Sequence, residues 1–242
     1  MNIDNILGTD KNPLISIVRH YEQERIQRGM GFVYKNLSRR IKVIATCKHH
    51  FISNPYTDFT FLLGAKSVQL KILSEPFYSD KKSEDLVLFV VEDSRRHQNI
   101  EFNTNAKVFK PFSGQILYNS KCEFNPHTPL VFPYYVMRQE IFPIDMMYAV
   151  NNFDTTCIAV GPNDEEKHKE FIENGSVVYP ALGMVSKVGC SGSPIFDDEL
   201  NLYGINIRGS DGNNGDVLVY VPVSNINELY RKAQSEIRKF GL

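Results

Sequence analysis

The sequence lacks tryptophan, any long apolar run and any excess of charge of one sign. No segment approaches the roughly 18 consecutive apolar residues that a membrane-spanning helix needs, so we do not expect the chain in a membrane. Lys and Arg total 27 and Asp and Glu total 28, which gives a formal charge of -1. Binding of nucleic acid or of an anionic lipid surface over a broad area usually needs a basic excess, so neither partner is expected.

Cysteine is also scarce, and no two cysteines have the spacing of a C-x-x-C pair, which argues against a zinc ribbon or a thioredoxin-type motif. The first 12 residues contain charged side chains and no apolar stretch of a secretory signal. A chain of 242 residues can bury enough surface to fold without disulfides. We therefore expect free thiols and a cytoplasmic location, with delivery into a host cell as a variant of it. The four cysteines are Cys47, Cys122, Cys157 and Cys190.

Short runs rich in Val, Ile, Phe and Tyr recur along the chain, and Gly, Pro, Asn or Asp residues bound them. Such runs are typical of β-strands. Regular helices do not separate them, so their number and spacing predict an all-β barrel or sandwich rather than a parallel α/β sheet. The expected strands are 14–18, 31–34, 42–46, 60–63, 67–73, 86–91, 108–112, 146–150, 156–160, 176–179, 194–196, 202–207 and 217–223.

One clear helix is predicted at the end of the chain. Ser224 or Asn225 can cap it, and apolar residues follow at helical spacing. A second, short helix is expected within 163–173. Several prolines between residues 98 and 143 indicate a long connection between two halves of the molecule. The apolar stripe of the terminal helix consists of Ile226, Leu229, Tyr230, Ala233 and Ile237.

The most specific motif is the hexamer Gly-Cys-Ser-Gly-Ser-Pro at residues 189–194. Glycine lets the backbone adopt unusual φ angles, so that successive N–H groups can converge into an oxyanion hole. Ser191 stands between the glycines and just before an apolar run, where a nucleophilic serine is expected. The alternative interpretation is a Gly/Ser-rich turn between two strands.

A serine hydroxyl needs a base at neutral pH, and the base needs a carboxylate that fixes its tautomer. His49 follows the strand expected at 42–46 and is the candidate base. Asp85 stands at the start of the run 86–91 and is the candidate carboxylate. Each residue taken by itself is more often an ordinary surface or turn residue. Their order along the chain, His then Asp then Ser, is what indicates a catalytic triad.

A metal site is the other chemistry that these residues suggest. Cys47, His49 and His50 are residue types that bind zinc, but no fourth ligand stands at a useful spacing. We therefore expect neither a metal nor another cofactor. His50 also competes with His49 for the part of the base. Adjacent side chains of an extended segment point to opposite sides, so only one of the two can face Ser191.

Several motifs together resemble those of the trypsin-like serine proteases of the chymotrypsin fold, in particular the HtrA-like and intracellular branch. The matches keep the order of that family from residue 29 to residue 223. Thr46, three residues before His49, favours His49 over His50 as the base of the family motif. The matching segments are 29–33 for G-x-G-F-[IV], 44–49 for the base, 85–88 for the aspartate, 189–194 for the nucleophile, 203–206 for the strand that follows and 221–223 for the closing strand.

The resemblance implies an all-β fold of two six-stranded antiparallel β-barrels with a C-terminal α-helix and an active site between the barrels. By this resemblance, Ser191 would attack a peptide carbonyl, His49 would transfer the proton and Asp85 would orient His49. The main-chain N–H groups of Gly189 and Ser191 would bind the oxyanion. The implied domains are 1–105 for the barrel with His49 and Asp85, 106–142 for the connection, 143–223 for the barrel with Ser191 and 224–242 for the helix.

The resemblance also implies a substrate preference and a departure from the secreted enzymes. Val185 would form the base of the pocket for the residue before the cleaved bond, with Arg208 and Gly209 in its wall. An apolar base predicts a small or medium apolar residue there, and Arg208 leaves an acidic preference open. Cys190 stands where secreted relatives have the aspartate that pairs with a new N-terminus, so activation by that cleavage is not expected.

We expect a serine endopeptidase whose partner is a protein or peptide substrate. Two alternatives remain open at this point. The first is a catalytically silent protease-like module that binds proteins, and the second is a viral-type or pathogen-delivered processing protease. The second shares the chemistry of the main hypothesis and differs in biology.

Overall fold

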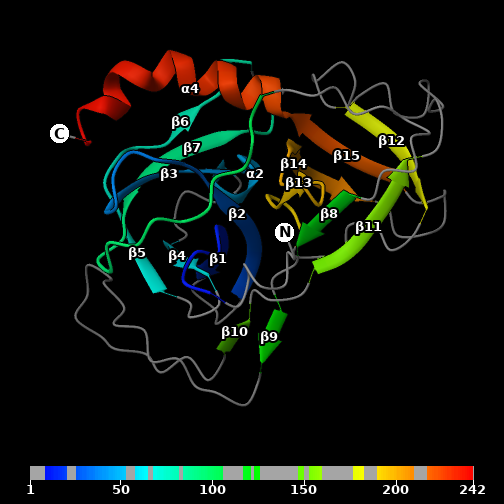
Figure 1. Ribbon diagram of the computed structural model, residues 1–242, viewed down its shortest axis with the longest axis horizontal. Helices are drawn as coiled ribbons and strands as arrows, with labels where there is room; N and C mark the ends of the chain where they lie inside the picture. Colours follow the sequence, from blue (N-terminus) through cyan, green and yellow to red (C-terminus); the bar gives the residue numbers. More distant parts are fainter. Residues whose placement is uncertain are drawn as a thin grey trace.

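The structure is a computed structural model. It describes residues 9–20, 26–52, 58–64, 68–81, 84–105, 117–120, 123–125, 147–149, 153–159, 177–182, 190–209 and 217–241. The described part forms two β-barrels side by side, with one long helix above them (Figure 1). The strand expected at 108–112 and the helix expected within 163–173 lie outside the described residues.

The first barrel is built from the N-terminal strands. Their order is β3-β2-β1-β4-β5-β7-β6, and β3 also pairs with β7, which closes six of the strands into a ring and leaves β6 attached to β7. All of these pairings are antiparallel. The strands are β1 (Leu14–His20), β2 (Ile26–Asn36), β3 (Ile41–Thr46), β4 (Asp58–Leu63), β5 (Val68–Ile72), β6 (Phe77–Tyr78) and β7 (Val87–Glu92).

A mainly aliphatic cluster fills this barrel, and its phenylalanines reach one short helix, α2 (His49–Ile52). Phe51 from α2 packs against Phe59 and Phe89, with ring centroids 4.7 and 4.9 Å apart. Burial of large aromatic rings is a major stabilising contribution, and the offset and edge contacts add to it. Phe51 thereby fixes α2, and the histidines that open it, to the end of the barrel.

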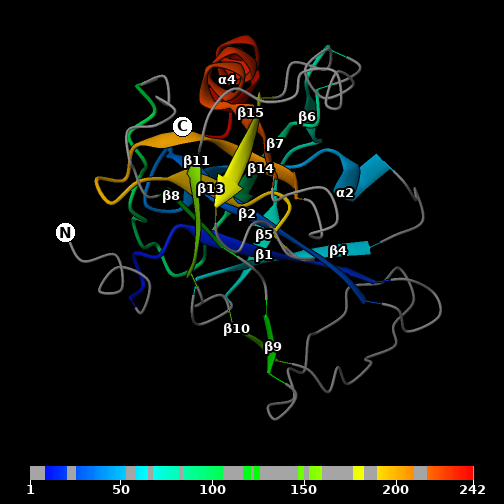
Figure 2. The ribbon, with the colours of Figure 1, turned by 90° about the vertical axis from the view of Figure 1, so that its right-hand side faces the viewer.

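The second barrel is also closed and has the strand order β11-β12-β15-β14-β13-β8. A separate two-stranded sheet of β9 and β10 lies below the barrels, on the side opposite to the long helix (Figure 2). The strands are β8 (Leu117–Ser120), β9 (Glu123–Asn125), β10 (Met147–Ala149), β11 (Phe153–Ala159), β12 (Val177–Leu182), β13 (Pro194–Phe196), β14 (Leu202–Gly209) and β15 (Val217–Pro222).

The prediction of two six-stranded antiparallel barrels and a C-terminal helix is confirmed. One strand of the second barrel lies where the sequence indicated a connection. β8 falls within the segment 106–142 and pairs with both β11 and β13. Its four residues, Leu-Tyr-Asn-Ser, contain two apolar side chains only, so composition gave little sign of a strand.

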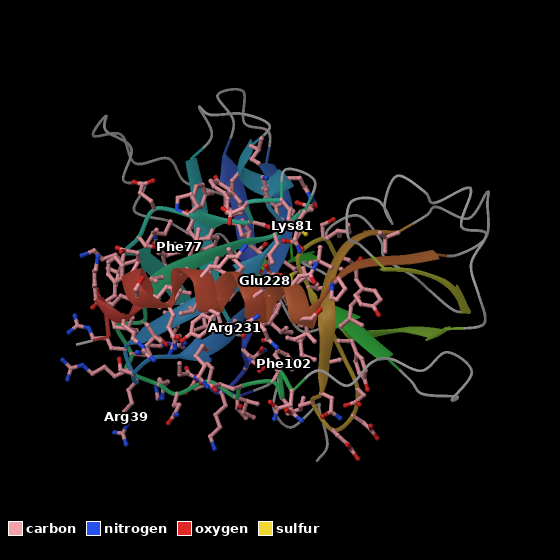
Figure 3. The ribbon with its side chains drawn as sticks, turned by 90° about the horizontal axis from the view of Figure 1, so that it is seen from above. Arg39, Phe77, Lys81, Phe102, Glu228 and Arg231 are labelled. Carbon is pink, nitrogen blue, oxygen red and sulfur yellow. The ribbon has the colours of Figure 1, made fainter. Side chains whose placement is uncertain are left out.

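The long helix α4 (Val223–Arg238) lies across the first barrel (Figure 3). Its buried stripe contains four of the five expected residues, together with Val223. The expected cap at Ser224 or Asn225 is wrong, because the helix begins directly after β15 with Pro222 at the capping position and no side-chain cap. Asn225 instead donates to Glu84, in the turn that precedes β7. Among the described helices, none has the length and apolar character needed to cross a membrane.

Candidate active site

Two adjacent strand ends bring the candidate base and carboxylate together. β3 pairs with β7 so that Thr46 lies opposite Val87. His49 stands just after β3, Asp85 just before β7, and the two therefore meet at the same edge of the first barrel. His49 Nδ1 lies 2.5 Å from Asp85 Oδ2, and the His49 main-chain N–H donates to Asp85 Oδ1 over 2.7 Å.

The carboxylate is held in its ionised form. Burial by itself would raise the pKa of Asp85, but hydrogen bonds from His49 and the charge of that ring outweigh burial and lower the pKa. The His49 side chain is 43% exposed, against 22% for Asp85. A half-exposed imidazole that rests on a more buried carboxylate can accept a proton from a neighbouring group and hold it as an imidazolium.

The candidate nucleophile lies in a turn between Cys190 and β13 that only glycine can complete. Gly192 has φ +89°, and a Cβ there would lie 1.8 Å from the main-chain oxygen of Met30 and 2.6 Å from Thr46 Oγ1. Its N–H donates to the Asn206 carbonyl on β14 over 2.7 Å. This turn therefore presses directly against the first barrel.

Two groups of the first barrel hold the carbonyl oxygen of Ser191. The Met30 N–H donates to it over 2.7 Å, and His50 Nε2 lies 3.0 Å from it. The Ser191 hydroxyl donates to the Ile207 carbonyl over 3.3 Å. The structure thus brings Ser191 to the edge of the first barrel that carries His49 and Asp85.

The neighbouring histidines have different environments. His49 is half-exposed, whereas His50 is buried, with 3% of its surface exposed. Their rings lie 4.3 Å apart between centroids. His49 bonds to the Asp85 carboxylate, whereas His50 bonds to a main-chain oxygen. This difference favours His49 as the base.

Cys47 adds a buried thiol to this site. Its Sγ donates to the Asn206 carbonyl over 3.3 Å, and burial, followed by the charge of Asp85, raises its pKa well above the usual range. One donor atom from each of Cys47, His49 and His50 lies within 4.8 Å of the others, a spacing that a metal ion could span. Each of the three residues also bonds to another group, so a metal would have to compete with the bonds to Asn206, Asp85 or Ser191.

The remaining predicted residues are only partly described. Gly189 and Val185 lie outside the described residues. Arg208 and Gly209 form the end of β14, directly after Ile207, and they pair with Val219 and Leu218 on β15.

Sequence reasoning missed three groups that hold the turn: the main chains of Met30 and Asn206, and the His50 ring. The first two act through backbone atoms, for which the side-chain pattern gives no signal. The only available sign for His50 was that it stands beside the candidate base.

No family model matches the sequence, and no curated protein matches it either. Among solved structures, the chain is similar to the crystal structure of the serine endoprotease from Yersinia pestis, with a TM-score of 0.54 and 14% sequence identity. The similarity covers 100% of this chain and 68% of that chain. Together with the two closed barrels and the terminal helix, it shows that the chain has a chymotrypsin-like fold.

Proposed function

We propose that this protein is a serine endopeptidase with Ser191 as nucleophile, His49 as general base and Asp85 as the carboxylate that orients the base. The observation that carries the proposal is the bond from His49 Nδ1 to Asp85 Oδ2. This bond lies at the same edge of the first barrel that holds the Ser191 carbonyl. The fold similarity to a serine endoprotease agrees with this assignment.

The reaction follows from the chemistry of the three groups. The Ser191 hydroxyl turns from the Ile207 carbonyl and gives its proton to His49 Nε2 while Oγ bonds to the carbonyl carbon of the substrate. Asp85 stabilises the imidazolium that forms. The N–H groups of Gly189 and Ser191 hold the oxyanion, a contribution that is typically worth about 10²–10³ in rate per donor.

Collapse of this intermediate breaks the C–N bond, and His49 returns the proton to the leaving amine nitrogen. The acyl group then remains on Ser191 Oγ. A water molecule attacks this ester while His49 takes one of its protons, and the second collapse releases the acid and restores the serine. No redox partner or cofactor is needed to balance these steps.

For the substrate we propose a protein or peptide with a small or medium apolar residue before the cleaved bond. Support comes from the sequence match of Val185 to the base of the specificity pocket. An acidic residue at that position is the competing preference, because Arg208 follows Ile207 on β14.

A protein-binding module without catalysis is the second candidate. The observation in its favour is that the Ser191 hydroxyl donates to the Ile207 carbonyl, which engages the proton that catalysis must transfer. This candidate predicts a folded protein whose Ser191 does not react with electrophiles.

A fluorophosphonate probe separates the two candidates, because it reacts with a serine that has a competent base. We expect labelling of the wild type at Ser191, with none in Ser191→Ala and a large loss in His49→Ala. Ser224→Ala is the matched control, since Ser224 is exposed on α4 and its removal leaves the site intact. Turnover should fall by about 10⁶ in Ser191→Ala, as in other triads.

The same variants test the substrate preference. Lysate treated with wild type or Ser191→Ala is compared by mass spectrometry, and the new termini give the residue before each cleaved bond. An apolar residue there supports the proposed preference, and Lys or Arg contradicts it. A folded wild type that neither labels nor cleaves would favour the binding module.

A further inference from the structure

The main-chain carbonyl of Ser191 is bonded from the first barrel by two donors, Met30 N–H and His50 Nε2. A carbonyl oxygen only accepts hydrogen bonds, so the contact from His50 requires a proton on Nε2. His50 is therefore an Nε2–H donor here. An imidazole that donates from this atom to a backbone oxygen does not use it as a base.

The packing around His50 holds its ring in this orientation. Only 3% of its surface is exposed, and the Nε2 side of its ring occupies the space that a side chain at Gly29 would need. A Cβ at position 29 would stand 2.3 Å from His50 Nε2, so only glycine leaves room for the ring. Phe51 meets the ring edge to face, with centroids 6.1 Å apart.

The bond from His50 acts on one particular peptide plane. The carbonyl of Ser191 and the N–H of Gly192 belong to the same peptide unit, which is rigid and planar. His50 and Met30 hold the oxygen from the first barrel, and the Asn206 carbonyl receives the N–H on the second. The plane is thus fixed at both ends, and with it the ψ angle of Ser191.

We propose that His50 is a positioning residue for Ser191, which holds the Ser191–Gly192 peptide plane so that the nucleophile faces His49. This inference rests on the proposed function. It assigns adjacent histidines to different tasks, one that moves the proton and one that fixes the group from which the proton comes. A carbonyl left with the Met30 donor only would allow the plane to tilt and would misalign Oγ.

The experiment compares His50→Met, which keeps a side chain of similar size without a donor, with His50→Gln, whose amide can donate from a similar position. We expect kcat to fall about tenfold in His50→Met, the loss that one hydrogen bond of ordinary strength would give, with KM unchanged. His50→Gln should recover most of kcat. His97→Met is the matched control, because the His97 side chain is half-exposed and faces Asp10 rather than a residue of the site.

Gly29→Ala tests the same bond from the other side and guards against a misfolded His50→Met. Its Cβ would push the imidazole away from Ser191 while leaving it in the chain. We expect the same fall in kcat. Denaturant unfolding of every variant shows whether the loss of turnover exceeds what a loss of stability explains.

Three results would overturn the proposal. Wild-type kcat in both His50→Met and Gly29→Ala would show that the bond has no positioning effect. Loss of turnover in His50→Gln as complete as in Ser191→Ala, with His49→Gln still active, would make His50 the base. Absence of probe labelling in the wild type would remove the proposed function itself, and that result differs from the other two because no variant is involved.

Discussion

Gly192 shows how strictly a single residue can be determined by its surroundings. Its φ of +89° disfavours any residue with a Cβ, and the Met30 oxygen and Thr46 occupy the space that a Cβ would take. Thr46 Oγ1 itself donates to the Met30 oxygen over 2.7 Å, so this wall is braced and cannot easily retreat.

We predict that Gly192→Ala abolishes probe labelling of Ser191 and lowers the free energy of unfolding by about 1–3 kcal/mol, the usual range for backbone strain of this kind. Gly241→Ala is the matched control. A Cβ there would have Leu37 as its nearest neighbour at an ordinary 3.5 Å. Equal labelling of the two variants would contradict the close fit of the turn that carries Ser191.

For single residues, the sequence predicted that His49 pairs with Asp85, because each of the two stands beside an apolar run that is recognisable as a strand. The role of His50 could not be predicted in the same way. Its partner oxygen belongs to a residue 141 positions away, and a contact of that separation leaves no trace in the local pattern.

Helix α4 packs the C-terminal end of the chain against the first barrel. Asn225 donates to the buried Glu84, which also accepts a bond from Ser79 and directly precedes Asp85. On the other side of the helix, Asn227 accepts a bond of 2.6 Å from the Tyr34 hydroxyl. The helix therefore braces both β2 and the turn that carries the candidate carboxylate.

The contact from Tyr34 gives a prediction for alkaline pH. Burial, followed by the charge of Tyr230, raises the pKa of Tyr34 from 10.0 to about 12. A group whose pKa is raised on folding contributes stability that is complete below its unfolded pKa and is lost as the pH rises towards its folded pKa. The contribution of Tyr34 is therefore present below pH 10.0 and declines from there to about 12.

Tyr34→Phe should be less stable than the wild type at pH 8 by about 0.5–1.5 kcal/mol, the net value of one hydrogen bond. The difference should shrink as the pH rises above the usual tyrosine pKa of about 10. Denaturant unfolding at a series of pH values measures both stability curves. Curves that stay parallel through this range would show that the tyrosine ionises equally in the folded and unfolded chain.

Elements that carry many apolar residues were the ones that the sequence predicted well. β7 is buried at five of its six positions and coincides closely with the expected strand at 86–91. β6 has two residues, and β8 has a polar half, so neither contains enough pattern to be recognised. The start of α4 was misjudged because Asn225 resembles a capping residue by type but bonds to Glu84.

At the scale of the whole molecule, the site depends on contact between the barrels. Met30 and His50 from the first barrel bond to Ser191, and Cys47 from the first barrel bonds to Asn206 on the second. Cys47 has no exposed surface and a raised pKa, and the thiolate is the form that reacts with alkylating reagents. The rate at which the Cys47 thiol is alkylated therefore shows when the contact between the two barrels is broken.

We predict that iodoacetamide modifies Cys47 slowly in the native protein and that the rate rises in step with global unfolding in denaturant. Peptide mapping identifies the modified cysteine, and the fully unfolded chain supplies the reference rate. Rapid modification of Cys47 while the protein is still folded would mean that the barrels separate on their own, before either of them unfolds.

The division of the site between the barrels also has a consequence for biosynthesis. Translation proceeds from the N-terminus, and the first barrel needs only the strands from β1 to β7. A nascent chain at that stage contains His49 and Asp85, but Ser191 and the β14 oxygen that anchors its peptide plane have not yet left the ribosome. The triad that we propose is therefore incomplete until the second barrel has emerged and docked onto the first.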